Sequence, residues 1–518
     1  MKHHAWRIPL LLALIAAGAL GGYRLDQESL WVDEAISVFR SQQPWDQLLA
    51  FFKDPIGVRP LYWLVLKLWM ALFGTSEAAV RSLSVALGVL GVGATYWLGR
   101  LLFGTAVASV AALWLATSPM LVWYMQEARM YTLLILFAAL SCALYWRIVQ
   151  GKRSGGSWLA YALAALGVIL SHQVGVLVVA ACGVHFALFK LDRQFVARHR
   201  GPLALLGGVM LVVFGLSLPY LISRYASSRG IHDADYVLNL HSILGNYVVG
   251  LHAWYWTSPL QAWVLIALVG GLFAGGAAQL PAVQRWTRAW WKPDVSQQPA
   301  DGDHAVVLLL IWLFFSVVVA WVGTSLVHSL QIRYTLAGLP PFLLLAALGW
   351  QRLTTLKGQW AKWASAGLLV VVLLLNGVSL QDYYATTKKQ EFRPAASQLE
   401  RWLETRPLPL FGIGTSSDEA LRYYGIPPIH YLAGGWGISA LSPEEVGALA
   451  QPLADASQGQ RRFVLVVADY PHLRCDCVDL PETMAAFVQR LLPRIALLEA
   501  QAFFRVWVGL FERRAGEG

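Results

Sequence analysis

The sequence predicts a polytopic α-helical membrane protein of about eleven transmembrane helices, followed by a small C-terminal α/β domain outside the cytoplasm. Hydrophobic residues make up 57% of the 518 positions and charged residues only 14%, with a mean hydropathy of +0.52. A soluble chain carries roughly 25% charged residues. The 24 tryptophans and 19 tyrosines suit a chain with many membrane–water boundaries, where amphipathic rings settle.

The individual spans are predicted from apolar runs of about 20 residues. They lie near 8–23, 82–102, 105–124, 130–149, 157–172, 174–190, 202–222, 260–280, 304–325, 334–350 and 364–381. The run from Pro60 to Phe73 is too short to cross comfortably and contains Lys67. We therefore interpret it as an interfacial helix that lies against the bilayer.

Basic residues in the connections between spans predict the orientation of the chain. With the N-terminus in the cytoplasm, the cytoplasmic connections hold clusters of basic residues, whereas the alternate connections hold one or none. The clusters are Arg147, Lys152 and Arg153; Lys190, Arg193, Arg198 and Arg200; Arg285, Arg288 and Lys292; and Arg352, Lys357 and Lys362. The net charge of +10 is thus explained by topology, and nucleic-acid binding is not expected.

Two domains follow from these patterns. Residues 1–382 form the transmembrane module, whose first external loop, 24–80, holds the interfacial helix. An odd number of spans places residues 383–518 outside, where strand-like runs alternate with helix-like stretches, as in a small α/β domain. The strand-like runs are 408–413, 462–468, 495–499 and 503–510, and the helix-like stretches are 443–454 and 483–492.

An acidic pair, Asp33 and Glu34, lies in the first external loop. Adjacent carboxylates beside a membrane are costly unless they are solvated, paired or functional. One interpretation is a pair at a helix N-terminus, stabilised by the helix dipole. The other is a general base, because low local dielectric shifts the pKa of a carboxylate towards the useful range.

Further polar groups are predicted on the same external face. Each has a structural alternative: Arg59 as a headgroup anchor, Glu127 with Arg129 as a local ion pair, His172 as a helix cap, and Arg333 as a snorkelling cation. The functional alternative is a phosphate site, for which the planar fork of an arginine is suited. The topology brings the groups to one face, whereas anchoring charges would be spread over both. The candidates for this site are Arg59, Glu127, Arg129, Tyr131, His172, Arg333 and Tyr334.

An ordered series of motifs in the first 380 or so residues resembles the GT-C glycosyltransferases of the protein O-mannosyltransferase and lipid A aminoarabinose transferase type. The series comprises Trp31-Val-Asp-Glu-Ala, Arg59-Pro-Leu-Tyr-Trp, Leu72-Phe-Gly, Arg81-Ser-Leu-Ser, Arg100-Leu-Leu-Phe-Gly, Ser118-Pro, Gln126-Glu-Ala-Arg-Met-Tyr, Ser171-His and Arg333-Tyr with Pro340. Phe392-Arg with Ala395-Ala resembles the opening of the external domain in bacterial relatives.

The resemblance implies a bundle of about a dozen helices with an active cavity on the periplasmic face of the bacterial inner membrane. It implies a polyprenyl-phosphate sugar as donor and a lipid, glycan or protein hydroxyl as acceptor. Asp33 matches the family's base, and Glu34 is expected either to orient Asp33 or to bind a divalent cation such as Mg²⁺ or Mn²⁺. No dedicated metal site and no other cofactor is predicted. Arg333, with Arg81 or Arg129, is expected to stabilise the leaving phosphate.

Arg59 departs from the family pattern, because many relatives have a Pro-Pro pair where this chain has Arg59-Pro60. Three alternatives stay open. A transporter or flippase of lipid-linked sugars would carry charges at the bilayer midplane and inverted repeats, which the sequence lacks. A scaffold protein would not need the intact acidic pair. A glycosyltransferase of another branch, arabinosyl or oligosaccharyl, is the nearest alternative.

Overall fold

The structure is a computed structural model that describes residues 7–50, 60–189, part of 197–211, 240–249, 259–277, 301–322, 332–387, 389–404, 407–413, 417–433, 449–468, 487–489 and 495–514. The chain divides into two compact units. One, here the helical unit, consists of Met1–Tyr23, Pro44–Trp69 and Arg81–Ala385. The other, here the sheet unit, consists of Arg24–Gln43, Met70–Val80 and Thr386–Gly518, and so includes parts of the first loop.

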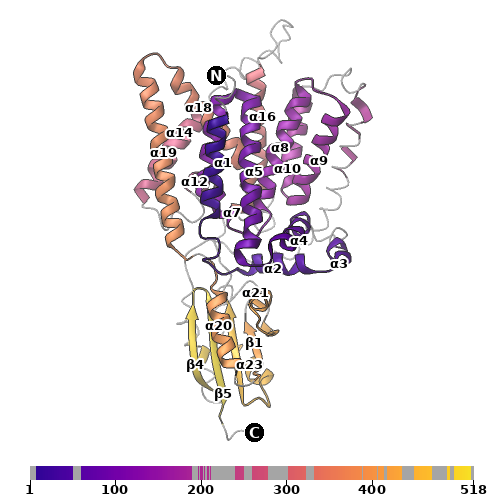
Figure 1. The fold of residues 1–518 in the computed structure, drawn as a ribbon, viewed down its shortest axis with the longest axis vertical. Helices are drawn as coiled ribbons and strands as arrows, with labels where there is room; N and C mark the ends of the chain where they lie inside the picture. The colour runs from indigo at the N-terminus through magenta and orange to yellow at the C-terminus, as the bar shows by residue number, and fades with distance from the viewer. Residues whose placement is uncertain are drawn as a thin grey trace. The chain divides into compact units, whose positions relative to one another are not determined.

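The helical unit is a bundle of apolar helices, as the sequence predicts (Figure 1). Its elements are α1 (Arg7–Gly22), α3 (Trp45–Ala50), most of α4 (Leu61–Phe73) and of α5 (Glu77–Phe103), α6 (Thr105–Ala116), α7 (Pro119–Met125), α8 (Tyr131–Val149), α9 (Gly155–Ser171), α10 (Gly175–Phe189), α12 (Leu240–Val249), α14 (Pro259–Ala277), α16 (Asp301–Phe314), α18 (Leu339–Thr355) and α19 (Gln359–Ala385).

Among the described residues, five helices are long and apolar enough to cross a membrane. They are Glu77–Phe103, Tyr131–Val149, His304–Val322, Ile332–Thr355 and Gln359–Ala385. Several shorter apolar helices accompany them, including Arg7–Gly22, Gly155–Ser171 and Gly175–Phe189. The protein is therefore a multi-pass membrane protein, while the predicted span 202–222 falls largely outside the described residues and the total of about eleven spans stays a prediction.

The predicted single span 105–124 is wrong in one respect, because it is broken into α6 and α7 with a bend of 58°. Pro119 occupies the first turn of α7, where its missing N–H costs nothing, and it cannot continue α6. Ser118 caps the new helix, since its hydroxyl accepts a hydrogen bond from the Leu121 N–H at 3.5 Å. The Ser-Pro motif thus starts a second helix inside one apolar run.

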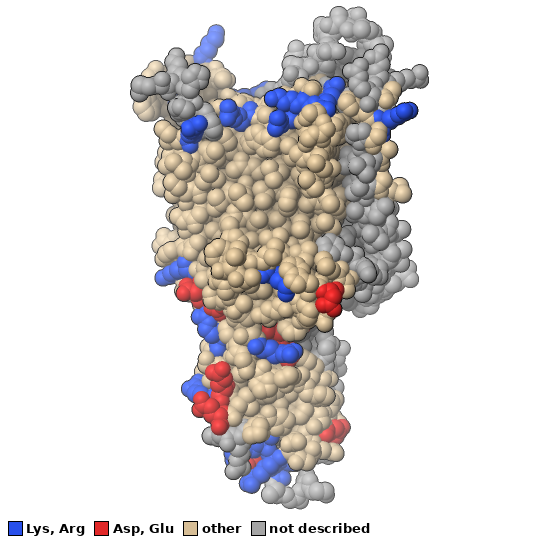
Figure 2. Space-filling model, turned by 45° about the vertical axis from the view of Figure 1, so that its right-hand side comes forward, with Lys and Arg blue, Asp and Glu red and all other residues tan. Residues whose placement is uncertain are grey.

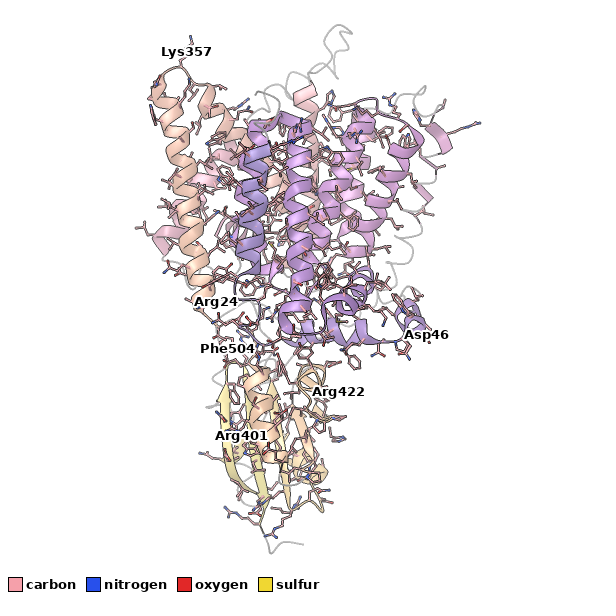
Figure 3. The ribbon with its side chains drawn as sticks, in the orientation of Figure 1. Arg24, Asp46, Lys357, Arg401, Arg422 and Phe504 are labelled. Atoms are coloured by element: carbon pink, nitrogen blue, oxygen red, sulfur yellow. The ribbon has the colours of Figure 1, made fainter. Side chains whose placement is uncertain are left out.

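The two ends of the helical unit differ in charge. On the face drawn in Figure 2, Lys and Arg gather at one end, and a broad band of the described surface next to them holds no charged side chain. Lys357, from a connection that the sequence places in the cytoplasm, lies at one end of the bundle (Figure 3). Asp46, from the first loop, lies at the opposite end, as the predicted topology requires.

The sheet unit contains a five-stranded mixed sheet in the order β2-β1-β3-β5-β4. The strands are β1 (Leu410–Ile413), β2 (His430–Ala433), β3 (Arg462–Ala468), β4 (Ile495–Phe503) and β5 (Val506–Arg513), and the helices are α2 (Val32–Gln42), α20 (Phe392–Leu403), α21 (Ser417–Tyr423) and α23 (Ala450–Ala456). β1 pairs with β2 and β3 in parallel, whereas β5 pairs with β3 and β4 antiparallel.

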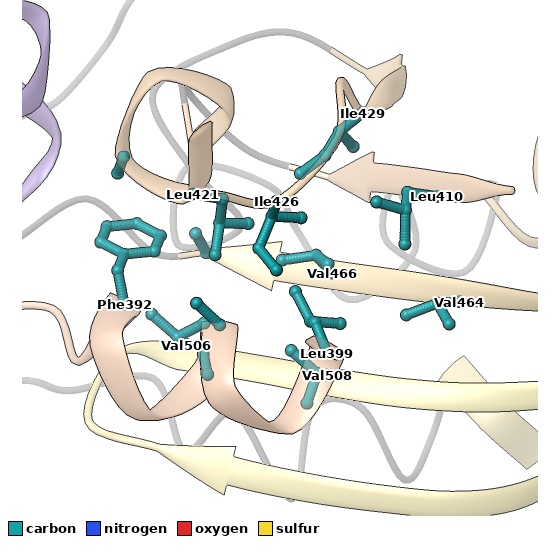
Figure 4. Close-up of a cluster of buried hydrophobic side chains, with 14 of the residues drawn as sticks. Phe392, Leu399, Leu410, Leu421, Ile426, Ile429, Val464, Val466, Val506 and Val508 are labelled. Atoms are coloured by element: carbon teal, nitrogen blue, oxygen red, sulfur yellow. The ribbon is translucent and has the colours of Figure 1, made fainter. Parts of the chain in front are cut away.

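The central strand β3 has apolar side chains on both faces, so each face carries its own core. On one face Val464 and Val466 pack with α20 and α21 (Figure 4). On the other face Phe463 and Leu465 pack with Phe411 and Phe511 and their neighbours. A C-terminal α/β fold is therefore present, with β2, α20 and α21 as elements that the sequence patterns did not isolate.

The predicted helix-like stretch 443–454 is described from residue 449 on, where α23 overlaps it, whereas only 487–489 of the stretch 483–492 lie among the described residues. The helix α2, although far away in sequence, also belongs to the sheet unit. Its buried Val32 and Ala35 share the core with Phe392 and Leu399 of α20. This packing fixes the orientation of the helix that carries the acidic pair.

Candidate functional site

The acidic pair occupies the first turn of α2, which begins at Val32. The geometry that the helix-dipole interpretation requires is therefore present, because carboxylates in the first turn of a helix lie near its unsatisfied N–H groups. The two carboxylates nevertheless differ in exposure, since Glu34 is fully buried and Asp33 is only partly buried. The structure thus gives the two residues separate environments.

Glu34 makes a buried ion pair with Lys389. Its Oε2 lies 3.1 Å from the Lys389 ammonium, and the side chains are 0% and 6% exposed respectively. The same oxygen accepts the backbone N–H of Trp31 at 3.3 Å. This contact is one half of a capping box, and Trp31 has no side-chain acceptor for the other half. A buried carboxylate needs such partners, because a desolvated charge without them is strongly destabilising.

The backbone on either side of Asp33 is held as well. The N–H of Val32 donates to Oε1 of Gln390 at 3.3 Å. The hydroxyl of Ser37 donates to the carbonyl oxygen of Asp33 at 2.9 Å. The main chain that presents Asp33 is therefore fixed from both sides, which limits the directions that its carboxylate can take.

A second group of predicted residues comes together within the helical unit. The guanidinium of Arg333 lies 5.9 Å from the ring centre of Tyr131 and 6.0 Å from that of Tyr334. The His172 ring lies 5.9 Å from Tyr131 and 5.3 Å from Tyr334. Three distant segments thus place an arginine among aromatic rings, where cation–π attraction holds it. We call Tyr131, His172, Arg333 and Tyr334 the arginine cluster.

Three of the sequence motifs also meet in the helical unit. The hydroxyls of Tyr62 and Ser84 lie 2.9 Å apart, and Ser84 donates to the carbonyl of Arg129 at 3.3 Å. Glu127 is 4% exposed, and its Oε1 accepts the indole N–H of Trp123 at 2.7 Å. These contacts tie the turn between α7 and α8 to α4 and α5, and so fix the connection that leads into Tyr131.

The two remaining candidates are Arg81 and Arg59. Arg81 is 2% exposed on α5. A buried arginine on a transmembrane helix is a functional hypothesis by default. Arg59 lies outside the described residues.

Sequence analysis did not single out Lys389, Gln390, Tyr62, Ser84, Trp123 or the side chain of Gln126 as site residues. Gln126 donates to the carbonyls of Gly21 and Tyr23 at 3.2 and 2.6 Å and accepts from Tyr383 at 3.0 Å. Its place in the Gln126-Glu-Ala-Arg motif was the available signal. No sequence signal pointed to Lys389, because its partner, Glu34, is 355 residues away in sequence.

No three His, Cys, Asp or Glu side chains come together as metal ligands in the part of the chain that the structure describes. Cys142 and Cys182, which the sequence places within apolar spans, are buried free thiols whose sulfur atoms lie 3.6 Å apart.

Comparisons with known proteins identify what the chain resembles. Residues 54–220 match the family model of dolichyl-phosphate-mannose-protein mannosyltransferase. Among solved structures, ArnT from Cupriavidus metallidurans in the apo state is similar over 98% of both chains, at 16% identity and a TM-score of 0.55. The same protein bound to undecaprenyl phosphate has a TM-score of 0.51, also at 16% identity and 98% of both chains.

A second similar fold is the oligosaccharyltransferase AglB from Archaeoglobus fulgidus, in complex with an inhibitory peptide and a dolichol-phosphate. The likeness covers 98% of this chain and 74% of that one, at 12% identity and a TM-score of 0.55. A sequence comparison with curated proteins finds no match. The resemblance to the GT-C glycosyltransferases that the sequence motifs predicted is thereby confirmed, and the similar structures establish the fold.

Proposed function

From the GT-C glycosyltransferase fold of this membrane protein, we propose that it is an inverting glycosyltransferase. It moves a sugar from a polyprenyl-phosphate donor to a hydroxyl of a lipid, glycan or protein at the periplasmic face of the bacterial inner membrane. The family match over residues 54–220 and the likeness to an ArnT structure bound to undecaprenyl phosphate support this class of donor.

The observation that carries the proposal is the arginine cluster. Four of the predicted donor residues, from three separate segments, lie within one aromatic group in the helical unit. A guanidinium can donate two parallel hydrogen bonds to a phosphate, and its charge offsets the negative charge that grows on a leaving phosphate. We assign the donor phosphate to this cluster.

Asp33 is the proposed base. Its carboxylate takes the proton of the acceptor hydroxyl while the acceptor oxygen attacks the anomeric carbon in line. The bond between that carbon and the phosphate oxygen breaks, and its electron pair leaves with the polyprenyl phosphate. The stereochemistry at the anomeric carbon inverts in this single displacement. The partial exposure of Asp33 supports its role, since a base must reach its substrate.

Glu34 is the proposed orienting residue. Of its two expected roles, orienting Asp33 is favoured, because the Lys389 ammonium already neutralises its buried carboxylate. Binding of Mg²⁺ or Mn²⁺ by Glu34 would require displacement of that ammonium. No metal-dependent step is therefore included in the proposal.

The test is to delete the gene and identify by mass spectrometry which glycoform of the cell envelope disappears. Wild-type protein should restore that glycoform, and Asp33→Asn should lower its formation at least about 100-fold. Asp33→Asn must reach the membrane at wild-type levels. A transporter of lipid-linked sugars would keep its activity in this variant, so near-normal glycoform would overturn the proposal.

A further inference from the structure

We propose that Lys389 and Gln390, from the C-terminal part of the sheet unit, are positioning residues that hold the first turn of α2, and with it Asp33. This inference rests on the proposed function, in which Asp33 is the base. The inference gives the C-terminal domain a role in catalysis, because this domain holds in place the loop that carries the base. We call residues 389–393 the clasp.

The first contact of the clasp is the buried ion pair. Glu34 is 0% and Lys389 6% exposed at the side chain, so both charges have lost their water. Each charge depends on the other, because removal of one partner leaves the other desolvated and uncompensated. Since Glu34 directly follows Asp33 and also caps the N–H of Trp31, movement of Glu34 would move the base.

The second contact acts on the backbone next to Asp33. The Val32 N–H is one of the four that a helix N-terminus leaves without intrahelical partners. Gln390 accepts it at 3.3 Å, so the first N–H of the helix is satisfied by a side chain from residues 389–393. The backbone directly before Asp33 is thus held by a residue 358 positions away in sequence.

The clasp is itself anchored to the sheet. Glu391 and Phe504, which lies in the turn between β4 and β5, exchange two hydrogen bonds. The Glu391 N–H donates to the Phe504 carbonyl at 3.1 Å, and the Phe504 N–H donates to Oε2 of Glu391 at 2.8 Å. The next residue, Phe392, is fully buried in the core of α20, β3 and β5 (Figure 4). Lys389 and Gln390 therefore directly precede two residues that are bound to the sheet and its core.

Arg393 extends the clasp to the start of the loop. Its N–H donates to the hydroxyl of Ser29 at 3.1 Å, and its Nη2 donates to the carbonyl of Asp26 at 2.6 Å. The loop is thus held at 26–29 and again at 31–34, on either side of Leu30. Support of this kind keeps a reacting group within the narrow range of geometry that catalysis needs.

The experiment uses the full-length protein and replaces Lys389 by Met, which keeps the length of the side chain and removes its charge. Hydrogen exchange at the Trp31 and Val32 amides should become about tenfold faster, while exchange in β3 and β5 stays as in wild type. Glycoform formation should fall about 100-fold, as expected for a base displaced by about 1 Å. Binding of undecaprenyl phosphate should be unchanged.

Three further variants separate positioning from general damage. Lys389→Arg should restore most of the glycoform. Adding Glu34→Gln to Lys389→Met should relieve part of the defect, because the desolvated charge is then gone and the amide oxygen of the new side chain can still accept the Trp31 N–H. Arg462→Met, which removes a cation from an ion pair with Glu512 that is 51% and 24% exposed, is the matched control and should behave as wild type.

Unchanged exchange at Trp31 and Val32 in Lys389→Met would overturn the inference, whatever the activity. Exchange that rises across β3 and β5 as well would also overturn it, since the lysine would then only stabilise the domain. An active Asp33→Asn would instead overturn the proposed function, and the amide exchange would still decide whether the clasp exists.

Discussion

Arg393 donates two hydrogen bonds to the carboxylate of Glu77, one from Nε to Oε1 at 3.1 Å and one from Nη2 to Oε2. Tyr424 donates its hydroxyl to the same carboxylate and accepts the N–H of Leu30 at 2.8 Å. Burial, together with the charge of Glu77, raises the pKa of Tyr424 well above its usual value. The hydroxyl therefore stays protonated and able to donate over the physiological range.

Arg393→Ala should destabilise the sheet unit by roughly 2 kcal/mol, because it removes charge-assisted hydrogen bonds from an 11% exposed carboxylate. Thermal unfolding of the full-length protein measures the change. Arg422→Ala is the matched control, since its ion pair with Asp418 is a more exposed i,i+4 pair, worth about 0.4 kcal/mol. Equal losses in the two variants would contradict the structural role given to Arg393.

Arg333→Ala should weaken binding of undecaprenyl phosphate at least about tenfold, because one charge-assisted contact with a phosphate is lost. Arg333→Lys should recover only part of the affinity, since an ammonium cannot form the two parallel hydrogen bonds of a guanidinium. Direct binding to purified protein measures both. Lys357→Ala, at the opposite end of the bundle from α3, is the control (Figure 3). Wild-type affinity in Arg333→Ala would remove the donor phosphate from the arginine cluster.

A third prediction concerns pH. Burial raises the pKa of Glu419 on α21 above its usual value, against the smaller opposing effects of Arg40 and Arg422. The folded state therefore binds this proton more tightly than the unfolded state, so stability is lost as pH rises from the unfolded pKa, about 4.3, through the folded one. Glu419→Gln removes this dependence.

Unfolding of the wild type and of Glu419→Gln, compared between about pH 4 and pH 7, should show the wild type losing stability relative to the variant as pH rises. Two parallel profiles would contradict the prediction, and the opposite slope would show that the arginines outweigh burial.

The helices of the membrane part could be predicted because their apolar runs are long and their ends carry clear signals. α8 and α10 begin or end within a residue of the predicted limits. The break at Ser118 was not predicted, because Ser-Pro lies within a continuous apolar run, and hydropathy does not distinguish one span from a bent pair.

The strands β1 and β3 were predicted from period and composition. β2 is as short as β1, but it was missed because this edge strand, His430-Tyr-Leu-Ala433, contains no β-branched residue. The acidic pair and the arginine cluster could be identified as candidates because charge beside a membrane is unusual. The pairing of Glu34 with Lys389 could not be predicted from the sequence, because the two residues are 355 positions apart and only folding brings them together.

The last prediction concerns the close packing of α14 and α18. A Cβ added to Gly349 would lie 1.9 Å from the carbonyl oxygen of Leu272, and one added to Gly276 would lie 1.9 Å from that of Leu345. The two backbones are in contact, so small residues are required where the helices cross. Gly349→Ala should therefore force the helices apart and destabilise the helical unit by about 1–3 kcal/mol.

Gly367→Ala, on α19, is the matched control, because a Cβ added there meets nothing within 4 Å. It should leave stability unchanged or raise it slightly, since alanine favours the helix by up to about 1 kcal/mol. Thermal unfolding in detergent compares the two variants. If Gly349→Ala unfolds at the temperature of Gly367→Ala, α14 and α18 do not approach as closely as the structure has them.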